Sequence, residues 1–220
     1  MRIVTTEDGT QTFYNEEHQE PYHSKSGAYD ESVQKYVKPC NIKNESVILD
    51  FCFGLGYNTL AAIASYDNLT ITAIENDPDL ILALDQITFE EPLIQVLFEQ
   101  MVLQLRQGVI EGKTDFIIVV GTSSIRFLLE DVQTAMPKLK HDFFDAVFYD
   151  PFSPKKQPEL WSVDMFKQCY NCMKSQAILS TYSYARMVRD NISEAGFTFA
   201  DGPIVGRRSP GSLGIKNEEK

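Results

Sequence analysis

The sequence predicts an α/β fold, a doubly wound and mostly parallel sheet within a single domain that spans residues 1–220. Two observations lead to this prediction. From Ser46 onward, short apolar runs rich in β-branched residues alternate with segments of helical apolar spacing. At 220 residues, the chain has the length of one generous domain. Such alternation is typical of parallel strands joined by helices.

The alternation defines the expected elements of the core, which is placed at residues 46–210. Buried strands are expected at 46–51, 69–75, 115–121, 144–150 and 176–181. Helices are expected at 57–66, 77–86, 90–108, 122–132, 162–173 and 185–196, from helical apolar spacing or a Ser, Thr or Asp start. Residues 197–208 are expected to close the sheet as two antiparallel strands joined at the Asp-Gly-Pro turn.

The two ends differ from the core in composition. Residues 1–40 are polar and aromatic, with a turn signal at 7–10, and are expected to form a cap-like extension that lines a site. Residues 214–220 are expected to be a flexible tail. The helix expected at 90–108 is apolar on more than one face, which favours core packing but leaves a subunit contact, and hence the oligomeric state, open.

Net charge, the length of the apolar runs and the cysteine spacing disfavour several classes of function. The formal net charge of −11 disfavours nucleic-acid contact outside a local basic patch. The apolar runs are too short to span a membrane and the first residues lack a secretory pattern, so a cytoplasmic location is expected. Cys169 and Cys172 have metal-ligand spacing, but without a second pair they favour a helix face, and we expect no metal and reduced thiols.

A glycine pair directly follows the first core strand, in VILDFCFGLGYNTL at residues 47–60. Gly54 and Gly56 allow a sharp turn and a close approach to a ligand. Glu75 ends the next strand about twenty residues later, where an acid accepts the ribose hydroxyls of an adenosyl ligand. The dinucleotide fingerprint requires a third glycine where Asn58 and Thr59 stand, so NAD is disfavoured.

The segment from Asp50 to Gly56 resembles the first motif of S-adenosylmethionine-dependent methyltransferases, with Cys52 in place of a glycine common there. The resemblance implies a Rossmann-like class I methyltransferase fold with S-adenosylmethionine as cofactor. It also implies that the acid ending the second strand forms the second motif and that a third-strand loop faces the adenine. The implied cofactor-binding residues are Asp50, Cys52, Gly54, Gly56, Asn58, Glu75, Thr122 and Ser123.

A longer string, FDAVFYDPFSPKKQPELWS at residues 144–162, resembles the methyltransferase half of the MnmC family. Those bifunctional enzymes complete 5-methylaminomethyl-2-thiouridine at the wobble position of tRNA. Residues 22–32, 181–197 and 205–214 are similar to the same family, so the resemblance covers nearly the whole chain. It implies a stand-alone methyltransferase without the flavin-binding half or FAD, and tRNA as a partner that is bound weakly or presented by another protein.

Under this resemblance, Asp150 is the expected catalytic group. A carboxylate at the end of the fourth strand can accept a hydrogen bond from the aminomethyl nitrogen of uridine and aim its lone pair; the alternative is a turn cap before Pro151. Aromatic residues are expected to stack on the base and basic ones to contact phosphate, although packing and solvated charge are the simpler interpretations. The expected substrate-binding residues are Tyr29, Phe152, Lys155, Trp161, Tyr182, Arg207 and Arg208.

Other functions stay open at this level. The acidic composition favours a methyltransferase for a small molecule or a protein, and Cys52 is compatible with a non-catalytic domain that binds an adenosyl ligand. An aminopropyltransferase is disfavoured, since no run of acids flanks the fourth strand. The sequence does not distinguish which tRNAs are used, whether the uridine is thiolated, or whether an aminomethyl or a carboxymethyl-type group is the substrate.

Overall fold

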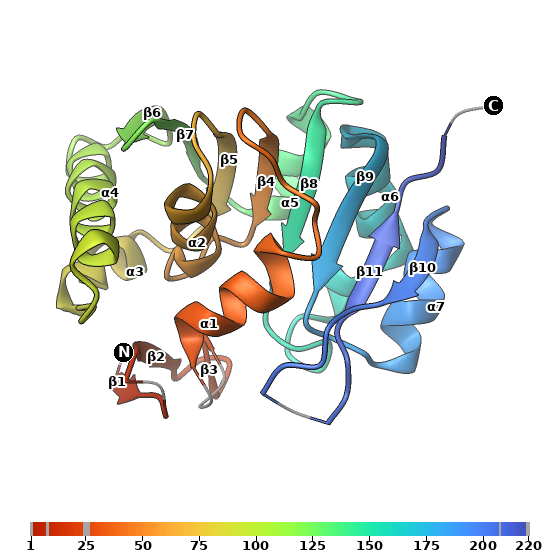
Figure 1. Cartoon of the computed structure of the whole chain (residues 1–220), viewed down its shortest axis with the longest axis horizontal. Helices are drawn as coiled ribbons and strands as arrows, with labels where there is room; N and C mark the ends of the chain where they lie inside the picture. The colour runs from red at the N-terminus through yellow and green to blue at the C-terminus, as the bar shows by residue number, and fades with distance from the viewer. Residues whose placement is uncertain (1, 8, 24–26, 207, 219–220) are drawn as a thin grey trace.

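An eight-stranded sheet lies between two layers of helices, and a separate three-stranded sheet lies against one end of this core (Figure 1). The computed structural model describes residues 2–7, 9–23, 27–206 and 208–218. The α/β fold expected from the sequence is therefore confirmed.

The large sheet has the order β10-β11-β9-β8-β4-β5-β7-β6. Strands β4, β5, β7, β8 and β9 run parallel, whereas β6, β10 and β11 each pair with a neighbour antiparallel. The strand bounds are β4 (Val47–Phe51), β5 (Thr70–Glu75), β6 (Asp115–Val120), β7 (Ser123–Leu129), β8 (Phe144–Tyr149), β9 (Met173–Thr181), β10 (Thr198–Asp201) and β11 (Ser212–Ile215).

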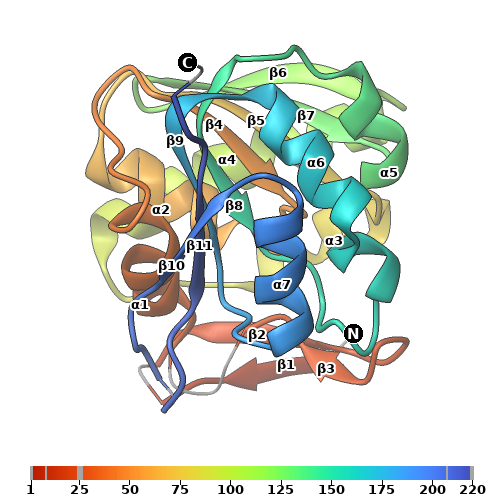
Figure 2. The same ribbon diagram turned by 90° about the vertical axis from the view of Figure 1, so that its right-hand side faces the viewer.

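Helices cover both faces of this sheet. Helices α1, α2 and α4 lie on one side and α5, α6 and α7 on the other (Figure 2), which matches the division of the buried apolar residues into two clusters. The helix bounds are α1 (Ala28–Ser32), a π-helical turn η1 (Val33–Val37), α2 (Tyr57–Ser65), α3 (Pro78–Ala83), η2 (Leu84–Gln86), α4 (Pro92–Ile110), α5 (Val132–Ala135), η3 (Met136–Lys138), η4 (Pro158–Trp161), α6 (Val163–Cys172) and α7 (Arg186–Glu194).

Residues 122–132 were expected to be helical, and that prediction is wrong for most of the segment. Gly121, with φ +56°, turns the chain, and β7 pairs antiparallel with β6 as the edge hairpin of the sheet. Burial along β7 alternates with a period of two, with Ser123, Ile125 and Phe127 buried and Arg126 exposed. The run at 115–121 is therefore an antiparallel edge strand, and β7 provides the third parallel strand next to β5.

The C-terminal antiparallel pair exists, but its second strand begins later than expected. Pro203 has no N–H to donate to a strand ladder, and ladder pairing resumes only at Ser212. Gly211, just before it, allows the close approach to β9, because an added Cβ there would lie 2.7 Å from the carbonyl oxygen of Thr181. Strand β11 then pairs with β9 as far as Ile215. The core sheet thus continues past residue 210, and the expected tail at 214–220 starts inside a strand.

Two further findings concern helices and cysteines. Among the residues that the structure describes, no helix has the length and apolarity needed to cross a membrane. All four cysteines are free thiols, and Cys169 and Cys172 lie on the buried face of α6. Within the described ranges no cluster of three or more His, Cys, Asp or Glu side chains is suited to a metal ion.

The N-terminal residues form an antiparallel sheet of β1 (Arg2–Thr5), β2 (Gln11–Asn15) and β3 (Glu20–Pro21). Phe13, 1% exposed, anchors this sheet in the apolar core. The strand order reverses at β4, between β5 and β8, and ligands bind at such reversals in open α/β sheets. The small sheet therefore closes over the edge where a ligand site is expected.

Candidate active site

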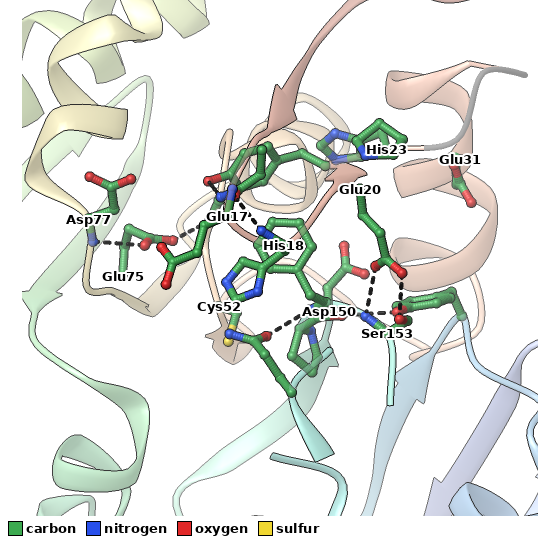
Figure 3. A pocket seen from close by; sticks show the side chains of 18 of the residues that line it. Glu17, His18, Glu20, His23, Glu31, Cys52, Glu75, Asp77, Asp150 and Ser153 are labelled. Carbon is green, nitrogen blue, oxygen red and sulfur yellow. Dashed lines mark hydrogen bonds between the residues drawn. The ribbon is translucent and has the colours of Figure 1, made fainter. Parts of the chain in front are cut away.

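A cavity of about 950 Å³ lies at the carboxyl ends of β4, β5 and β8. Its walls come from the loops after these three strands, from the small sheet and from the α1–η1 segment. Figure 3 shows Glu75 and Asp77 on one side of the cavity and Glu31 on the other, with Asp150 between them. The cavity thus has two ends with a carboxylate in the middle.

The end beneath β5 is organised by Glu75. Its carboxylate accepts hydrogen bonds from the backbone N–H groups of Gly54 at 2.9 Å, Asn76 at 2.8 Å and Asp77 at 3.0 Å. Burial raises the pKa of this carboxyl, and the three N–H donors oppose that rise. Glu75 and Gly54 both line the cavity.

The two glycines of the loop have different constraints. Both have positive φ, +56° for Gly54 and +77° for Gly56. An added Cβ at Gly56 would lie 2.4 Å from the ring of Phe53 and 2.9 Å from the methyl of Met101. At Gly54, which faces the cavity, the nearest atom would be a ring carbon of Tyr22 at 3.3 Å. Both positions therefore favour glycine for their left-handed φ, and packing adds a clash at Gly56 and a tight contact with Tyr22 at Gly54.

Asp50 lies below the cavity and is fully buried. Thr59 donates a hydrogen bond to its Oδ2 at 2.6 Å, while its Oδ1 has no partner among the described residues. Burial raises the pKa of Asp50 well above its usual value. An orphaned buried carboxylate oxygen beside a glycine loop fits a cationic group such as the ammonium of S-adenosylmethionine, so these residues are compatible with that cofactor.

Cys52 lines the cavity with φ +64°, a left-handed conformation that favours glycine. Burial raises the pKa of its thiol well above the usual range, so the sulfur stays protonated and is not a nucleophile. The cysteine therefore occupies a glycine conformation without contributing a thiolate.

Replacing Cys52 with Gly is expected to raise the free energy of unfolding by about 0.5–1 kcal/mol. The substitution stabilises the folded state by removing about 1–2 kcal/mol of left-handed strain. Glycine also gives the unfolded chain more conformational entropy, which offsets roughly 0.5–1 kcal/mol of that gain. The measurement is the midpoint of urea unfolding. Cys52→Ala is the matched control, since it removes the thiol and keeps the strain. Equal stabilisation by both variants would contradict the explanation.

Asp150 occupies the middle of the cavity, immediately after β8. The Tyr36 hydroxyl donates a short hydrogen bond to its Oδ1, and Asn58 Nδ2 donates to its Oδ2 at 2.9 Å. Burial raises the pKa of Asp150 to about 6, although both hydrogen bonds act to lower it. Tyr36 stays protonated, because burial and the neighbouring carboxylate raise its pKa well above 10. The carboxylate is thus fixed in orientation by two donors.

The loop after β8 forms a wall shared with the small sheet. Trp161 is fully buried and donates from its indole to the carbonyl of Phe152 at 2.8 Å, which holds the loop in place. The Phe152 ring packs on His18, with centroids 4.4 Å apart. Ser153 donates from its hydroxyl to Glu20 at 2.6 Å. The loop is therefore held from both sides.

Several expected site residues lie elsewhere. Thr122 and Ser123 lie at the opposite edge of the sheet, where they accept hydrogen bonds from the backbone of Asn68 and Leu69 at 3.0 Å each, so their predicted contact with adenine is wrong. They stand at the β6–β7 turn, before rather than after the third parallel strand. Outside the cavity lining are also Asp50, Gly56, Asn58, Tyr29, Lys155, Trp161 and Arg208.

The remaining expected substrate residues differ in placement. Phe152 and Tyr182 line the cavity, and Tyr182 donates to the carbonyl of Pro151 at 3.1 Å. Lys155 and Arg208 are exposed. Arg207 lies outside the described residues.

Sequence reasoning missed most of the acidic and aromatic groups around Asp150. The small sheet contributes Glu17, His18, Glu20 and Tyr22, and η1 contributes Tyr36. These residues carry no motif that marks them singly. The one available signal was the concentration of aromatic and acidic residues in the first forty positions, which led only to the prediction of a site-lining extension.

Comparison with known proteins assigns the family. A sequence model of S-adenosyl-L-methionine-dependent methyltransferases matches residues 92–217. The chain belongs to this methyltransferase family. Among the similar solved structures, MnmC2 from Aquifex aeolicus superposes on the methyltransferase with a TM-score of 0.77 at 27% identity, covering 97% of this chain and 69% of that one.

Two curated relatives extend the comparison. An uncharacterized protein of Methanocaldococcus jannaschii is 33% identical over 220 residues, 98% of the methyltransferase and 59% of the relative. The tRNA 5-methylaminomethyl-2-thiouridine biosynthesis bifunctional protein MnmC of Ralstonia nicotianae is 28% identical over 217 residues, 91% of the methyltransferase and 32% of that protein. The chain thus spans less than two thirds of each curated relative and is related to the methyltransferase region of MnmC.

Proposed function

We propose that this chain transfers a methyl group from S-adenosylmethionine to the primary amine of a 5-aminomethyl group on the wobble uridine, or 2-thiouridine, of tRNA. The observation that carries the proposal is Asp150, a buried carboxylate fixed by Tyr36 and Asn58 in the same cavity as Gly54 and Glu75. The MnmC relatives, which are tRNA 5-methylaminomethyl-2-thiouridine biosynthesis proteins, support the choice of substrate.

The residues of the cavity divide the work between cofactor and amine. When bound, S-adenosylmethionine supplies a methyl group activated by its sulfonium. Gly54 lies at the wall beside it and Glu75 accepts the ribose hydroxyls. Asp50, buried behind this wall with one oxygen unpartnered among the described residues, can take a hydrogen bond from the cofactor's ammonium. The cofactor end thus holds one reactant still, and such positioning accounts for roughly 7–11 kcal/mol of barrier lowering in well-aligned reactions.

Asp150 acts on the amine. An alkylammonium of pKa about 10.4 costs on the order of 4–5 kcal/mol to deprotonate at pH 7. A carboxylate with a pKa of about 6 accepts a hydrogen bond from the neutral amine and orients its lone pair. Once the C–N bond has formed, the product is an ammonium that loses one proton to solvent. Asp150 does not keep this proton, because a carboxyl with a pKa of about 6 is a much stronger acid than an alkylammonium with a pKa of about 10.4.

The direct test is methyl transfer to tRNA that carries 5-aminomethyl-2-thiouridine at the wobble position, read by nucleoside mass spectrometry. We expect a gain of one methyl group on that nucleoside, dependent on S-adenosylmethionine. tRNA from cells that lack the aminomethyl modification is the matched control and should gain none. Cofactor binding without any methyl gain would contradict the assigned substrate while retaining the assigned cofactor.

A second candidate is methylation of a small cationic amine, which the charge of the cavity favours. Glu17, Glu20, Glu31 and Asp77 line it in addition to Glu75 and Asp150. His23 adds no positive charge at neutral pH, since burial lowers its pKa to about 4. Such a lining attracts ammonium groups and repels phosphate. Methyl transfer to spermidine that persists after ribonuclease treatment would favour this candidate.

A further inference from the structure

A buried ion pair lies in the cavity wall opposite Glu75, on the short helical segment that follows the small sheet. Lys35 of η1 donates to the carboxylate of Glu31 in α1, one turn earlier. The side chain of Lys35 is 3% exposed and that of Glu31 is 11% exposed, and both line the cavity. The proposed methyl transfer uses neither residue.

Such a pair is costly to retain for stability alone. Removing two charges from water is offset by their attraction only when the remaining lone pairs and protons are also satisfied, and an apolar pair of similar volume is often at least as stable. An ammonium has three donors and a carboxylate about four acceptor sites. In the described part of the chain, one Lys35 donor is used, by Glu31. The Lys35 ammonium therefore retains capacity for further hydrogen bonds within the cavity.

The position of the pair relative to Asp150 is fixed by the backbone. Tyr36 directly follows Lys35 on the same π-helical turn and donates to Asp150. The charges of Glu31 and Lys35 act on Asp150 in opposite directions, beneath the larger effect of burial. Glu31 thus lies on the side of Asp150 away from Glu75 (Figure 3), and both members of the ion pair line the same cavity as Asp150.

We propose that Glu31 and Lys35 read the imide edge of the target uracil, with Lys35 donating to O4 and Glu31 accepting from N3–H. The inference rests on the proposed function. The aminomethyl group is attached at C5, so an amine held at Asp150 brings O4 and then N3–H toward the neighbouring wall. One donor and one acceptor in adjacent positions match that edge.

The same pair rejects cytosine. At the corresponding positions cytosine presents an N4 amino donor and an N3 acceptor, which places donor against donor and acceptor against carboxylate. A base read by two such hydrogen bonds is preferred by about 10- to 100-fold over one with the reversed pattern. The preference is therefore a property of the wild-type enzyme and can be measured without any substitution.

The experiment compares two anticodon stem-loop RNAs that carry 5-aminomethyluridine or 5-aminomethylcytidine at the wobble position. The full chain is assayed with each, and the ratio of kcat/KM values is the readout. We expect the wild type to favour the uridine by at least about tenfold. Lys35→Met and Glu31→Gln should reduce the ratio to within about threefold, mainly through KM for the uridine RNA. Lys38→Met is the matched control, since Lys38 is exposed at the end of η1, outside the cavity lining, and this variant should keep the wild-type ratio.

The outcomes separate this inference from the proposed function. If the wild type methylates both RNAs equally, the reading of the imide edge is overturned while the proposed methyl transfer stands. If folded variants that bind S-adenosylmethionine keep the wild-type ratio, the pair is structural and the inference is likewise overturned. If the wild type methylates neither RNA, the proposed function fails and the inference fails with it. Because the wild-type ratio alone decides the first case, a variant that does not fold leaves the test intact.

Discussion

Asp150→Asn is expected to lower kcat for methyl transfer by about 10²- to 10³-fold, the usual cost of removing a preorganised group that stabilises charge developing in the transition state. The amide keeps the shape of the carboxylate but loses the charge that accepts the amine's hydrogen bond and stabilises positive charge as the nitrogen is alkylated. The Kd for S-adenosylmethionine should change by less than about threefold, since the cofactor end is organised by Glu75 and Gly54. Steady-state kinetics and calorimetry measure the two quantities.

Asp145→Asn is the matched control for this prediction. Asp145 lies on the same strand, β8, but its carboxylate accepts from the backbone of Val47 at 2.8 Å and from Lys174 at 2.8 Å, away from the cavity lining. Its replacement should leave kcat nearly unchanged. If Asp150→Asn reduced kcat and cofactor affinity to the same extent, the assignment of Asp150 to the amine would be wrong.

The same carboxyl predicts a pH dependence. Because burial raises its pKa to about 6, activity should fall as the pH decreases through 6 and Asp150 is protonated. Folding raises this pKa from about 3.9, so the native state binds the proton more tightly than the unfolded chain. The carboxyl therefore favours folding below about pH 4 and disfavours it above 6. The gain in Tm from Asp150→Asn should accordingly be larger at pH 8 than at pH 4.

Tyr36→Phe tests whether Asp150 causes the fall of activity at acidic pH, called here the acidic limb of the pH profile. Removing the hydroxyl deletes a hydrogen bond that lowers the pKa of Asp150, so the acidic limb should move to higher pH. Tyr29→Phe is the control, since Tyr29 packs against Phe89 outside the cavity lining and should leave the limb in place. If the acidic limb of Tyr36→Phe lay at the same pH as that of the wild type, the pH dependence would not come from Asp150.

The sequence was sufficient for the parts of the fold and site that are set by local signals. The period of the apolar runs places β4, β5, β8 and β9, and the glycine pair with Glu75 marks the β4–β5 edge. Parallel order then brings Gly54, Glu75 and Asp150 to one edge of the sheet without any knowledge of tertiary contacts.

The rest depended on contacts that no local pattern encodes. Residues 123–129 contain apolar spacing compatible with a helix, and only pairing with both β5 and β6 makes them a strand. Because of that error, Thr122 and Ser123 were predicted at the carboxyl edge of the sheet, whereas they lie at the opposite edge. Tyr36 lies 114 residues from Asp150 in the chain, and Glu20 lies 133 from Ser153. Their roles follow from how the small sheet and η1 fold back over the core, which sequence spacing does not reveal.

Gly54→Arg is expected to abolish measurable binding of S-adenosylmethionine, a loss of at least about 100-fold in affinity, while the chain stays folded. Gly54 faces the cavity beside Glu75, so a long side chain there fills the space assigned to the cofactor and pairs with the acid assigned to its ribose. The left-handed φ of +56° adds about 1–2 kcal/mol of strain, which a folded domain of 5–15 kcal/mol tolerates. Calorimetry and thermal unfolding provide the two readouts.

Gly112→Arg is the matched control, because it introduces the same charge and left-handed strain at a glycine outside the cavity lining. Gly112 follows α4 with φ +72°, and an added Cβ there meets nothing within 4 Å, so this variant carries the same charge and comparable strain on an exposed turn. Both variants should lose Tm through their left-handed φ, Gly54→Arg more because its Cβ also lies 3.3 Å from the Tyr22 ring, but only Gly54→Arg should lose the cofactor. Unchanged affinity in Gly54→Arg would remove the glycine loop from the cofactor site, and equal loss in both variants would assign the effect to the backbone rather than to the cavity.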